Sequence, residues 1–180
     1  MEFSKDKTIL VSWSKYINSD KIIKELGHME GRIIDLLFML RNPPRYIFDK
    51  YWKMLNKLYD KDLMNTFIAV EKWLYNTPSI PGKLYLQMIN DCYINNNLIS
   101  NTMELDIGTI DLSRVDIPLL TVIAERDDLA SPESCLAVKD HISSKDKNIL
   151  KFNGGHVGLC ISSKAHKTIL PEIPEWILSR

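Results

Sequence analysis

The chain has 180 residues, the length of a single domain, and its hydrophobic share of 45% is ordinary for a globular protein. Lys and Arg together number 23, as do Asp and Glu, so the formal net charge is zero and no nucleic-acid partner is expected. The sequence has no apolar run long enough for a transmembrane segment, and residues 1–7 lack a signal-peptide pattern. Three cysteines without a pairing pattern favour a reducing compartment, so a cytoplasmic location is expected.

The first half of the chain is predicted to be mainly helical. A short apolar segment at Ile9–Val11 predicts a strand. Amphipathic spacing then predicts helices, with a break at Pro43-Pro44, over residues 33–40, 45–59, 61–75 and 84–93. Aromatic and Met side chains are concentrated in these helices, where they fit either a packed core or a lid over a binding site.

The last third of the chain predicts a strand–helix–strand unit. Leu119–Ala124 is a continuous apolar run, typical of a strand that is buried on both faces. Ser131-Pro132-Glu133 predicts a helix start, with Ser as the N-cap and Pro in the first turn. The helix is expected to reach Ile142, and the next strand to cover Asn148–Phe152. In such a unit the two strands are parallel, so the loops that follow them lie at the same edge of the sheet.

These two loops carry an acid and a histidine. Asp127 and Asp128 follow the first strand, and His156 follows the second, after a Gly154-Gly155 pair that is expected to allow a sharp turn. Gly158 is expected to relieve crowding behind the histidine. An acid and then a His on successive loops is how an α/β-hydrolase places the last two members of its triad. Either aspartate could orient His156.

The sequence lacks the nucleophile of such a triad. An α/β-hydrolase nucleophile lies in a G-x-S-x-G or G-x-C-x-G elbow before the acid, and no such box occurs. Cys92, Cys135 and Cys160 each fit a small buried apolar thiol, although Cys160 is close to His156 in sequence. No metal or cofactor is expected, because the other histidines lack Cys or His at metal-ligand spacing: His28, His141 and His166.

The loop sequences resemble a known family. Residues 124–134, Ala-Glu-Arg-Asp-Asp-Leu-Ala-Ser-Pro-Glu-Ser, and 154–158, Gly-Gly-His-Val-Gly, resemble the C-terminal part of polyhydroxyalkanoate (poly-3-hydroxybutyrate) synthases, in particular the catalytic subunits of the two-subunit type. Residues 70–78, with Glu-Lys-Trp, are similar to a segment of that family's cap region. The resemblance implies Asp127 as the triad acid and His156 as the general base. Asp128 departs from the pattern, since the family commonly has His there.

The resemblance implies a partial α/β-hydrolase fold. Residues 1–30 would connect from a missing core, residues 31–100 would form a helical cap, and residues 101–180 would form the C-terminal βαβα part of the parallel sheet. In this family a Cys thiolate is acylated by 3-hydroxyacyl-coenzyme A, and the polyester grows from that thioester. A chain with the Asp and His but without the Cys elbow is expected to be a truncated or split catalytic subunit, or a degenerate homologue.

The alternative is a non-catalytic interaction module that binds a full-length synthase or the surface of a polyester granule. The partners implied are hydroxyacyl-coenzyme A, the polyester chain, and either a second synthase subunit or the missing N-terminal half. Self-association is also expected, because a sheet cut before its nucleophile strand leaves an open edge.

Overall fold

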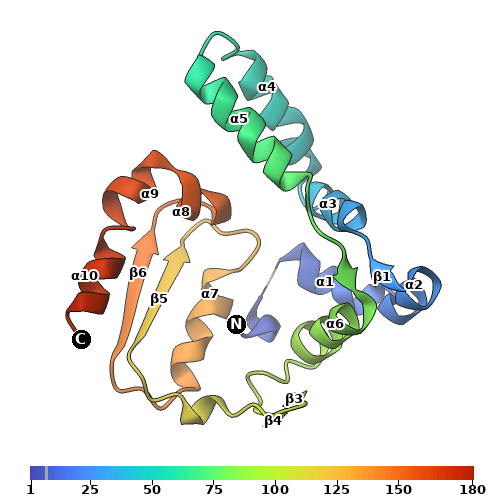
Figure 1. Ribbon diagram of the computed structural model, residues 1–180, viewed down its shortest axis with the longest axis vertical. Helices are drawn as coiled ribbons and strands as arrows, with labels where there is room; N and C mark the ends of the chain where they lie inside the picture. Colours follow the sequence, from blue (N-terminus) through green and yellow to red (C-terminus); the bar gives the residue numbers. More distant parts are fainter. Residues whose placement is uncertain (7) are drawn as a thin grey trace. The chain divides into compact units, whose positions relative to one another are not determined.

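The structure is a computed structural model that describes residues 1–6 and 8–180, without the side chain of Leu10 (Figure 1). Although the length is that of one domain, the chain divides into two compact units. Unit 1 consists of Met1–Ile17 and Ile89–Arg180, and unit 2 consists of Asn18–Met88. Both units combine helices with short strands, so the fold is mixed α/β. The division predicted at residues 30 and 100 refers to parts of a larger fold and stays a prediction.

The beginning of unit 1 is helical, so the strand predicted at Ile9–Val11 is wrong. A short 3-10 helix, η1 (Phe3–Lys5), precedes α1 (Ile9–Tyr16). Val11 and Ser14, three residues apart and therefore on one helix face, are both buried. The Ser14 hydroxyl donates to the Val11 carbonyl at 2.8 Å. A run of three apolar residues is too short to distinguish a strand from the buried stripe of a helix.

Unit 2 is a set of short helices with a two-stranded antiparallel sheet. Its elements are α2 (Ser19–Leu26), β1 (His28–Met29), α3 (Gly31–Leu40), the π-helix η2 (Pro44–Asp49), α4 (Lys50–Leu55), α5 (Lys61–Leu74), β2 (Ile80–Pro81) and α6 (Gly82–Gln87). In the sheet His28 lies opposite Pro81 and Met29 opposite Ile80. The helices predicted over 33–40 and 61–75 are confirmed by α3 and α5. The break predicted at Pro43-Pro44 is short. Pro44 is the first residue of η2, where a missing N–H removes no hydrogen bond of the helix.

The π-helix η3 (Met88–Ile94) follows α6 directly in the chain, and all of it except Met88 belongs to the second part of unit 1. Together α6 and η3 confirm the helical segment predicted over 84–93. A small hairpin follows, with β3 (Glu104–Leu105) antiparallel to β4 (Gly108–Thr109). The 3-10 helix η4 (Leu112–Arg114) then leads into the sheet that carries the candidate site.

That sheet consists of two parallel strands with helices beside them, as predicted. The elements are β5 (Leu119–Ala124), α7 (Pro132–Leu136), the 3-10 helix η5 (Ala137–Asp140), β6 (Lys147–Phe152), α8 (His156–Ile161), α9 (Ser163–Thr168) and α10 (Glu172–Leu178). Figure 1 shows α7 on one side of the strands and α8 to α10 on the other. Ser131 is the N-cap of α7, and its hydroxyl accepts from the Ser134 N–H at 3.3 Å. The apolar run of β5 and the helix-start motif at Ser131 therefore predicted the positions of β5 and α7 correctly.

The core of this region lies between the sheet and α9. It consists of Ala124 and Phe152 from the strand ends with Ala165 and Ile169 from the helical side. Val122 and Leu150, two residues earlier on each strand, pack against the same cluster, as expected for side chains that alternate between faces. The shared face fixes how the two strands, and therefore their terminal loops, sit against each other.

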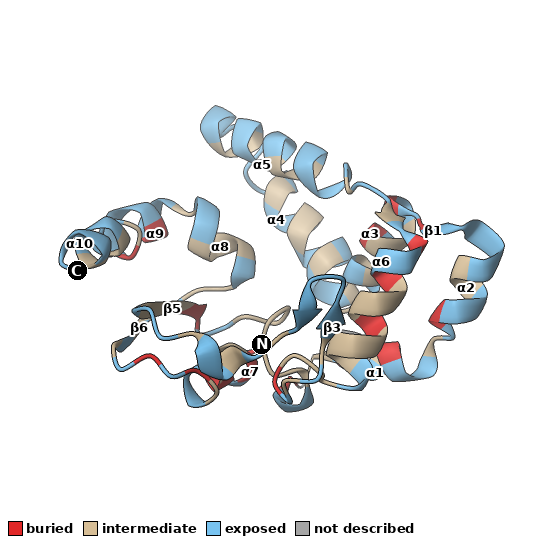
Figure 2. Cartoon of the chain, turned by 60° about the horizontal axis from the view of Figure 1, so that its bottom comes forward, coloured by how far each residue is buried: buried red, intermediate tan, exposed pale blue. Residues whose placement is uncertain are grey.

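The expectation that Leu119–Ala124 is buried on both faces is only partly correct. Ile123 and Ala124 are buried, whereas the first four residues of β5 are half-exposed (Figure 2). Within the described residues the sheet has two strands, not the larger sheet of a complete hydrolase. Among these same residues, none of the helices combines the length and apolarity that crossing a bilayer requires.

Candidate active site

The sheet brings the two polar loops together because β5 and β6 end at the same level. Leu119 lies opposite Lys147, and Ala124 lies opposite Phe152. The hydrogen bonding continues beyond the strands, since the Glu125 N–H donates to the Phe152 carbonyl at 2.9 Å. The Arg126 N–H donates to the Gly154 carbonyl, also at 2.9 Å. The two loops therefore stay side by side up to the residues that carry the acid and the histidine.

Asp127 is held by the backbone of its own loop. Its Oδ1 accepts from the N–H groups of Leu129 and Ala130, each at 2.9 Å. Its own N–H donates to the Ala124 carbonyl at 3.1 Å, which fastens the loop to the end of β5. The side chain is only 8% exposed. One oxygen of the carboxylate is thus occupied locally, and the other is left to face the neighbouring loop.

That second oxygen bonds the histidine. Asp127 Oδ2 lies 2.8 Å from Nδ1 of His156, the first residue of α8. An ionised carboxylate can only accept, so we assign the proton of the neutral imidazole to Nδ1. The Nε2 atom is then the basic nitrogen. Since the His156 side chain is 49% exposed, the ring is accessible to a reacting group while its orientation is fixed by a nearly buried acid.

The glycines of the second loop have a different role from the expected one. Neither Gly154 nor Gly155 has a positive φ, so the turn does not depend on glycine's conformational freedom. Instead, a Cβ at Gly154 would overlap the ring of Phe152, so the packing of that ring in the core requires glycine at position 154. At Gly158 a Cβ would lie 3.9 Å from that ring, an ordinary contact. The expectation that Gly158 relieves crowding is therefore wrong.

The cysteines differ in their surroundings. Cys92 and Cys135 are half-buried, and burial raises the pKa of both thiols. Cys160 is exposed, so the expectation of a buried thiol is wrong for this residue. It lies one helical turn after His156 on α8, on the same side of the helix. All three thiols are free.

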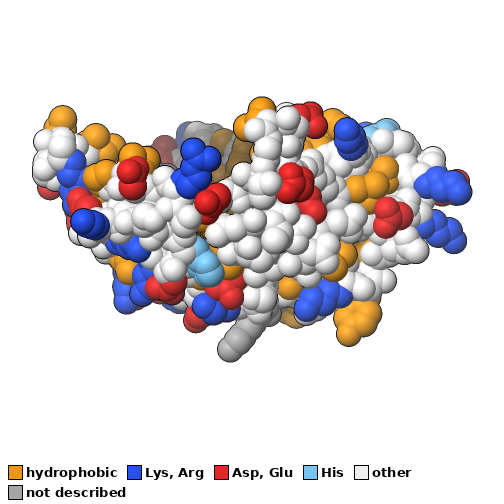
Figure 3. All heavy atoms as spheres, turned by 90° about the horizontal axis from the view of Figure 1, so that it is seen from below, with side chains coloured by type: hydrophobic (Ala, Val, Ile, Leu, Met, Phe, Trp, Pro, Cys, Tyr) orange, Lys and Arg blue, Asp and Glu red, His pale blue; other side chains and the backbone are white. Residues whose placement is uncertain are grey.

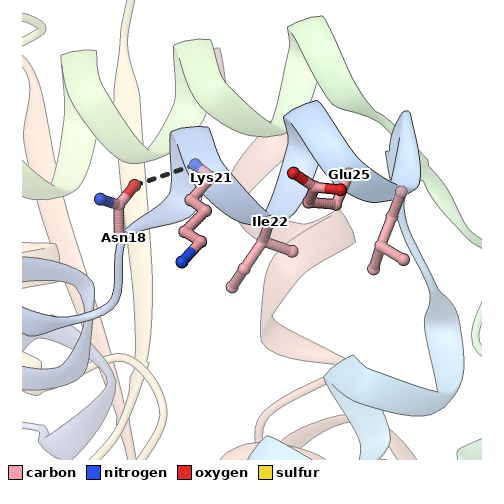
Figure 4. Close-up of a pocket in the computed structure, with 5 residues that line it drawn as sticks. Asn18, Lys21, Ile22 and Glu25 are labelled. Carbon is pink, nitrogen blue, oxygen red and sulfur yellow. Dashed lines mark hydrogen bonds between the residues drawn. The ribbon is translucent and has the colours of Figure 1, made fainter.

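The described residues offer a shallow hollow for a small molecule but no cluster of metal ligands. No group of three Cys, His or carboxylate side chains converges among them in a way that could hold a metal ion. A shallow hollow of about 380 Å³ lies beside α2, lined by Asn18, Lys21, Ile22, Glu25 and Leu26 (Figure 4). Asn18 Oδ1 is engaged as the helix cap, accepting from the Lys21 N–H at 2.9 Å. This hollow contains none of the candidate site residues.

The surface charge is mixed. On the face shown in Figure 3, Lys and Arg side chains lie among Asp and Glu side chains, in keeping with the equal totals in the sequence. A polyanionic partner would be bound by a concentrated basic patch rather than by such a mixture.

Curated proteins provide the comparison that bears on the site. The chain is 30% identical over its whole length to the poly(3-hydroxyalkanoate) polymerase subunit PhaC of Allochromatium vinosum, covering 51% of that protein. It is 29% identical over its whole length to PhaC of Thiocystis violacea and covers 51% of that protein. It is 30% identical over 174 residues to PhaC of Haloarcula marismortui and covers 37% of that protein. The chain resembles PhaC.

The PhaC-like chain spans 37% to 51% of the length of these three curated relatives. This coverage is consistent with the prediction that it corresponds to the C-terminal part of such a protein. No protein-family model matches the chain.

Of the residues predicted for the site of this PhaC-like chain, the structure brings Asp127 and His156 into direct contact. Sequence reasoning missed the two N–H donors that hold Asp127 and the fit of Gly154 against Phe152. The first had a signal, because Asp favours turns in which its side chain accepts from N–H groups two or three residues later. The fit of Gly154 against Phe152 had no signal in the sequence, because it depends on where the Phe152 ring lies in the core.

Proposed function

We propose that this chain provides the acid and the base of a polyhydroxyalkanoate synthase-like acyltransferase with an α/β-hydrolase fold. The observation that carries the proposal is the Asp127–His156 hydrogen bond at the carboxyl ends of adjacent parallel strands. The resemblance to PhaC over the whole chain supplies the reaction class. In this proposal the helices within residues 31–100 are the cap, and the protein acts in the cytoplasm at the polyester surface.

The proposed chemistry uses Nε2 of His156 as a proton shuttle. His156 takes the proton of a cysteine thiol, and the thiolate attacks the carbonyl carbon of 3-hydroxyacyl-coenzyme A. The coenzyme A thiolate leaves with the proton from His156, and the acyl group stays on the cysteine. A hydroxyl, deprotonated by His156, then attacks the cysteine thioester, an ester bond forms, and the proton returns to the cysteine sulfur. Asp127 holds the ring and stabilises the imidazolium at each stage.

The nucleophile in this proposal comes from residues that this chain does not contain. Cys92 and Cys135 are poor candidates, because their raised pKa lowers the thiolate fraction near neutral pH. Cys160 is exposed, yet it lies within a helix that His156 itself begins, rather than in a strand-to-helix elbow before the acid.

Reconstitution tests the proposal. The chain would be co-expressed with the half of the A. vinosum PhaC that it does not match, and coenzyme A release from 3-hydroxybutyryl-coenzyme A would be measured. His156→Ala should lower the rate by about 10²–10⁴-fold, the usual contribution of a general base. Asp127→Asn should lower the rate by the same factor or by a smaller one, because the His156 ring loses its orientation. Asp128→Asn is the matched control and should stay near the unmutated rate.

Two results would contradict the proposal. A dead Asp128→Asn variant beside an active Asp127→Asn variant would transfer the acid role to Asp128. Coenzyme A release by the chain alone, abolished by Cys160→Ala, would show that the nucleophile lies within the chain.

A second candidate is a non-catalytic module that binds a full-length synthase or a polyester granule. It is favoured by large apolar side chains of unit 2 that are more than 60% exposed, among them Phe48, Trp52 and Trp73. Exposed apolar patches commonly mark binding surfaces. Sedimentation with poly(3-hydroxybutyrate) granules that is lost in Trp52→Ser but kept in His156→Ala, with no activity in the reconstitution, would select this candidate.

A further inference from the structure

The first residues of unit 1 lie against α7, the helix that directly follows the Asp127 loop (Figure 1). The Glu2 N–H donates to the Ser134 carbonyl of α7 at 2.9 Å. Ser134 is completely buried, and α7 packs against η1 as well as against β5. We call residues 2–5 the strap, because this segment is fastened both to α7 and to the loop that follows η3.

Asn96 is the residue that fastens the strap to the loop after η3. The Phe3 N–H donates to Asn96 Oδ1 at 3.0 Å, and Asn96 Nδ2 donates to the Ser4 hydroxyl at 3.3 Å. The centroid of the Phe3 ring lies 4.4 Å from that of Tyr93 in η3. Asn96 has a φ of 56°, a left-handed conformation that asparagine adopts more readily than most residues. One side chain thus bonds the strap twice.

Any movement of α7 would reach the acid through a few residues. Asp127 Oδ1 accepts from the N–H groups of Leu129 and Ala130, and the next residue, Ser131, is the N-cap of α7. The helix has five residues, and so short a helix is held mainly by its neighbours. If α7 shifted, both N–H groups would shift with it, and the carboxylate would lose its orientation toward His156.

We propose that the strap positions the acid of the site, with Asn96 as a positioning residue that acts through the strap and α7 on Asp127. The proposal rests on the proposed function, in which the orientation of His156 by Asp127 sets the rate. Release of the strap should therefore lower kcat and leave KM unchanged, because it alters the alignment of the acid and the base and not the binding of the substrate.

Substitutions of two asparagines test this role. Asn96→Gly removes both side-chain bonds to the strap and keeps the backbone conformation, which glycine adopts freely. Asn96→Asp keeps the acceptor for the Phe3 N–H. Asn101→Gly is the matched control, because Asn101 also has a left-handed φ, of 57°, and its Oδ1 accepts from the Leu112 N–H at 2.9 Å. The control loses the same kind of bond within unit 1, but none of the bonds of the strap.

Amide exchange at Leu129 and Ala130 measures the bonds to Asp127 directly. Asn96→Gly should speed exchange at these two amides by about 3- to 10-fold, the effect of about one net hydrogen bond, and leave β5 and β6 unchanged. Nitrogen-15 NMR should show a weaker preference of the His156 proton for Nδ1. Asn96→Asp and Asn101→Gly should stay within about twofold of the unmutated exchange rates.

The same variants are then assayed for coenzyme A release in the reconstitution with the unmatched half of the A. vinosum PhaC. Asn96→Gly should lower kcat by about 3- to 10-fold at an unchanged KM. Asn96→Asp should restore most of the rate, and Asn101→Gly should keep it. This split between kcat and KM, and its recovery in Asn96→Asp, distinguish a positioning residue from one that only stabilises the fold.

Other outcomes overturn the proposal. Unchanged exchange in Asn96→Gly would mean that the strap does not hold α7, and faster exchange throughout β5 and β6 would mean a general loss of stability. An equal response in Asn101→Gly, or a loss in Asn96→Asp as large as in Asn96→Gly, would remove the assigned role of Asn96 Oδ1. Failure of the proposed function has a separate signature. The expected exchange and NMR changes, with no coenzyme A release by any variant, would refute the enzyme and leave the positioning of Asp127 by the strap in place.

Discussion

The C-terminal strand–helix region of unit 1 and the α4–α5 helices of unit 2 use their apolar residues differently. Beside Asp127 and His156 a small apolar core is buried, and its members are at most 6% exposed: Ala124, Phe152, Ala165 and Ile169. In unit 2, α4 and α5 contain no buried residue, and Trp52 is 68% exposed (Figure 2). The first region has a buried core that positions a site, whereas α4 and α5 have none.

Polar contacts link α4 and α5. Lys50 Nζ lies 2.5 Å from Glu71 Oε1, and the Tyr51 hydroxyl donates to Glu71 Oε2 at 2.9 Å. The hydrogen bond between the Tyr51 and Tyr75 hydroxyls raises the pKa of Tyr51, and burial and Glu71 raise it further. Tyr51 therefore keeps its proton and remains a donor to Glu71 at any physiological pH. These contacts link the two helices, while Trp52 and Trp73 stay more than 60% exposed.

The largest expected effect in this comparison is the loss of the core ring in unit 1. Phe152→Ala should destabilise the β5–β6 region by about 3–5 kcal/mol, the usual cost of removing a buried aromatic ring. Ile149→Ala, on the same strand but 37% exposed, should cost much less. Denaturant unfolding followed by amide exchange of β5 and β6 measures both. Similar costs for the two variants would mean that this region is not organised by its core.

A smaller effect is expected from the glycine beside that ring. Gly154→Ala should cost about 1–3 kcal/mol, because the added methyl group forces the Phe152 ring to move. Gly158→Ala lies inside α8 with room for a Cβ, so it should be neutral or stabilise by about 0.5–1 kcal/mol. Thermal unfolding of the two variants gives the difference. A larger loss of stability in Gly158→Ala than in Gly154→Ala would support the original expectation that Gly158 relieves crowding behind His156.

The smallest effect is expected on the exposed surface of unit 2. Trp52→Ser should change the free energy of unfolding by no more than about 0.5 kcal/mol, because the side chain is already in solvent. It should lower the binding of a hydrophobic dye and reduce self-association in sedimentation. A cost of several kcal/mol would mean that Trp52 is buried in solution, and the contrast between the two regions would fail.

Local sequence signals predicted the part of the fold that carries the site. The apolar run of β5, the Ser131 cap of α7 and the acid-then-His order each depend on neighbouring residues only, and all are found in the structure. The failures depend on distant contacts. Ile9–Val11 is part of a helix that buries one face, and not a strand. The role of Gly154 depends on the position of the Phe152 ring, and the exposure of Cys160 depends on how α8 packs. None of these can be derived from a short window of sequence.

The central claim is that Asp127 orients His156 so that Nε2 is the basic nitrogen. Nitrogen-15 NMR of the neutral His156 imidazole tests it most directly. The proton is expected on Nδ1. Asp127→Asn should weaken this preference, and Asp128→Asn should leave it unchanged. A neutral ring with its proton on Nε2, or one that responds only to Asp128→Asn, would contradict the assignment of Asp127 as the acid that orients His156.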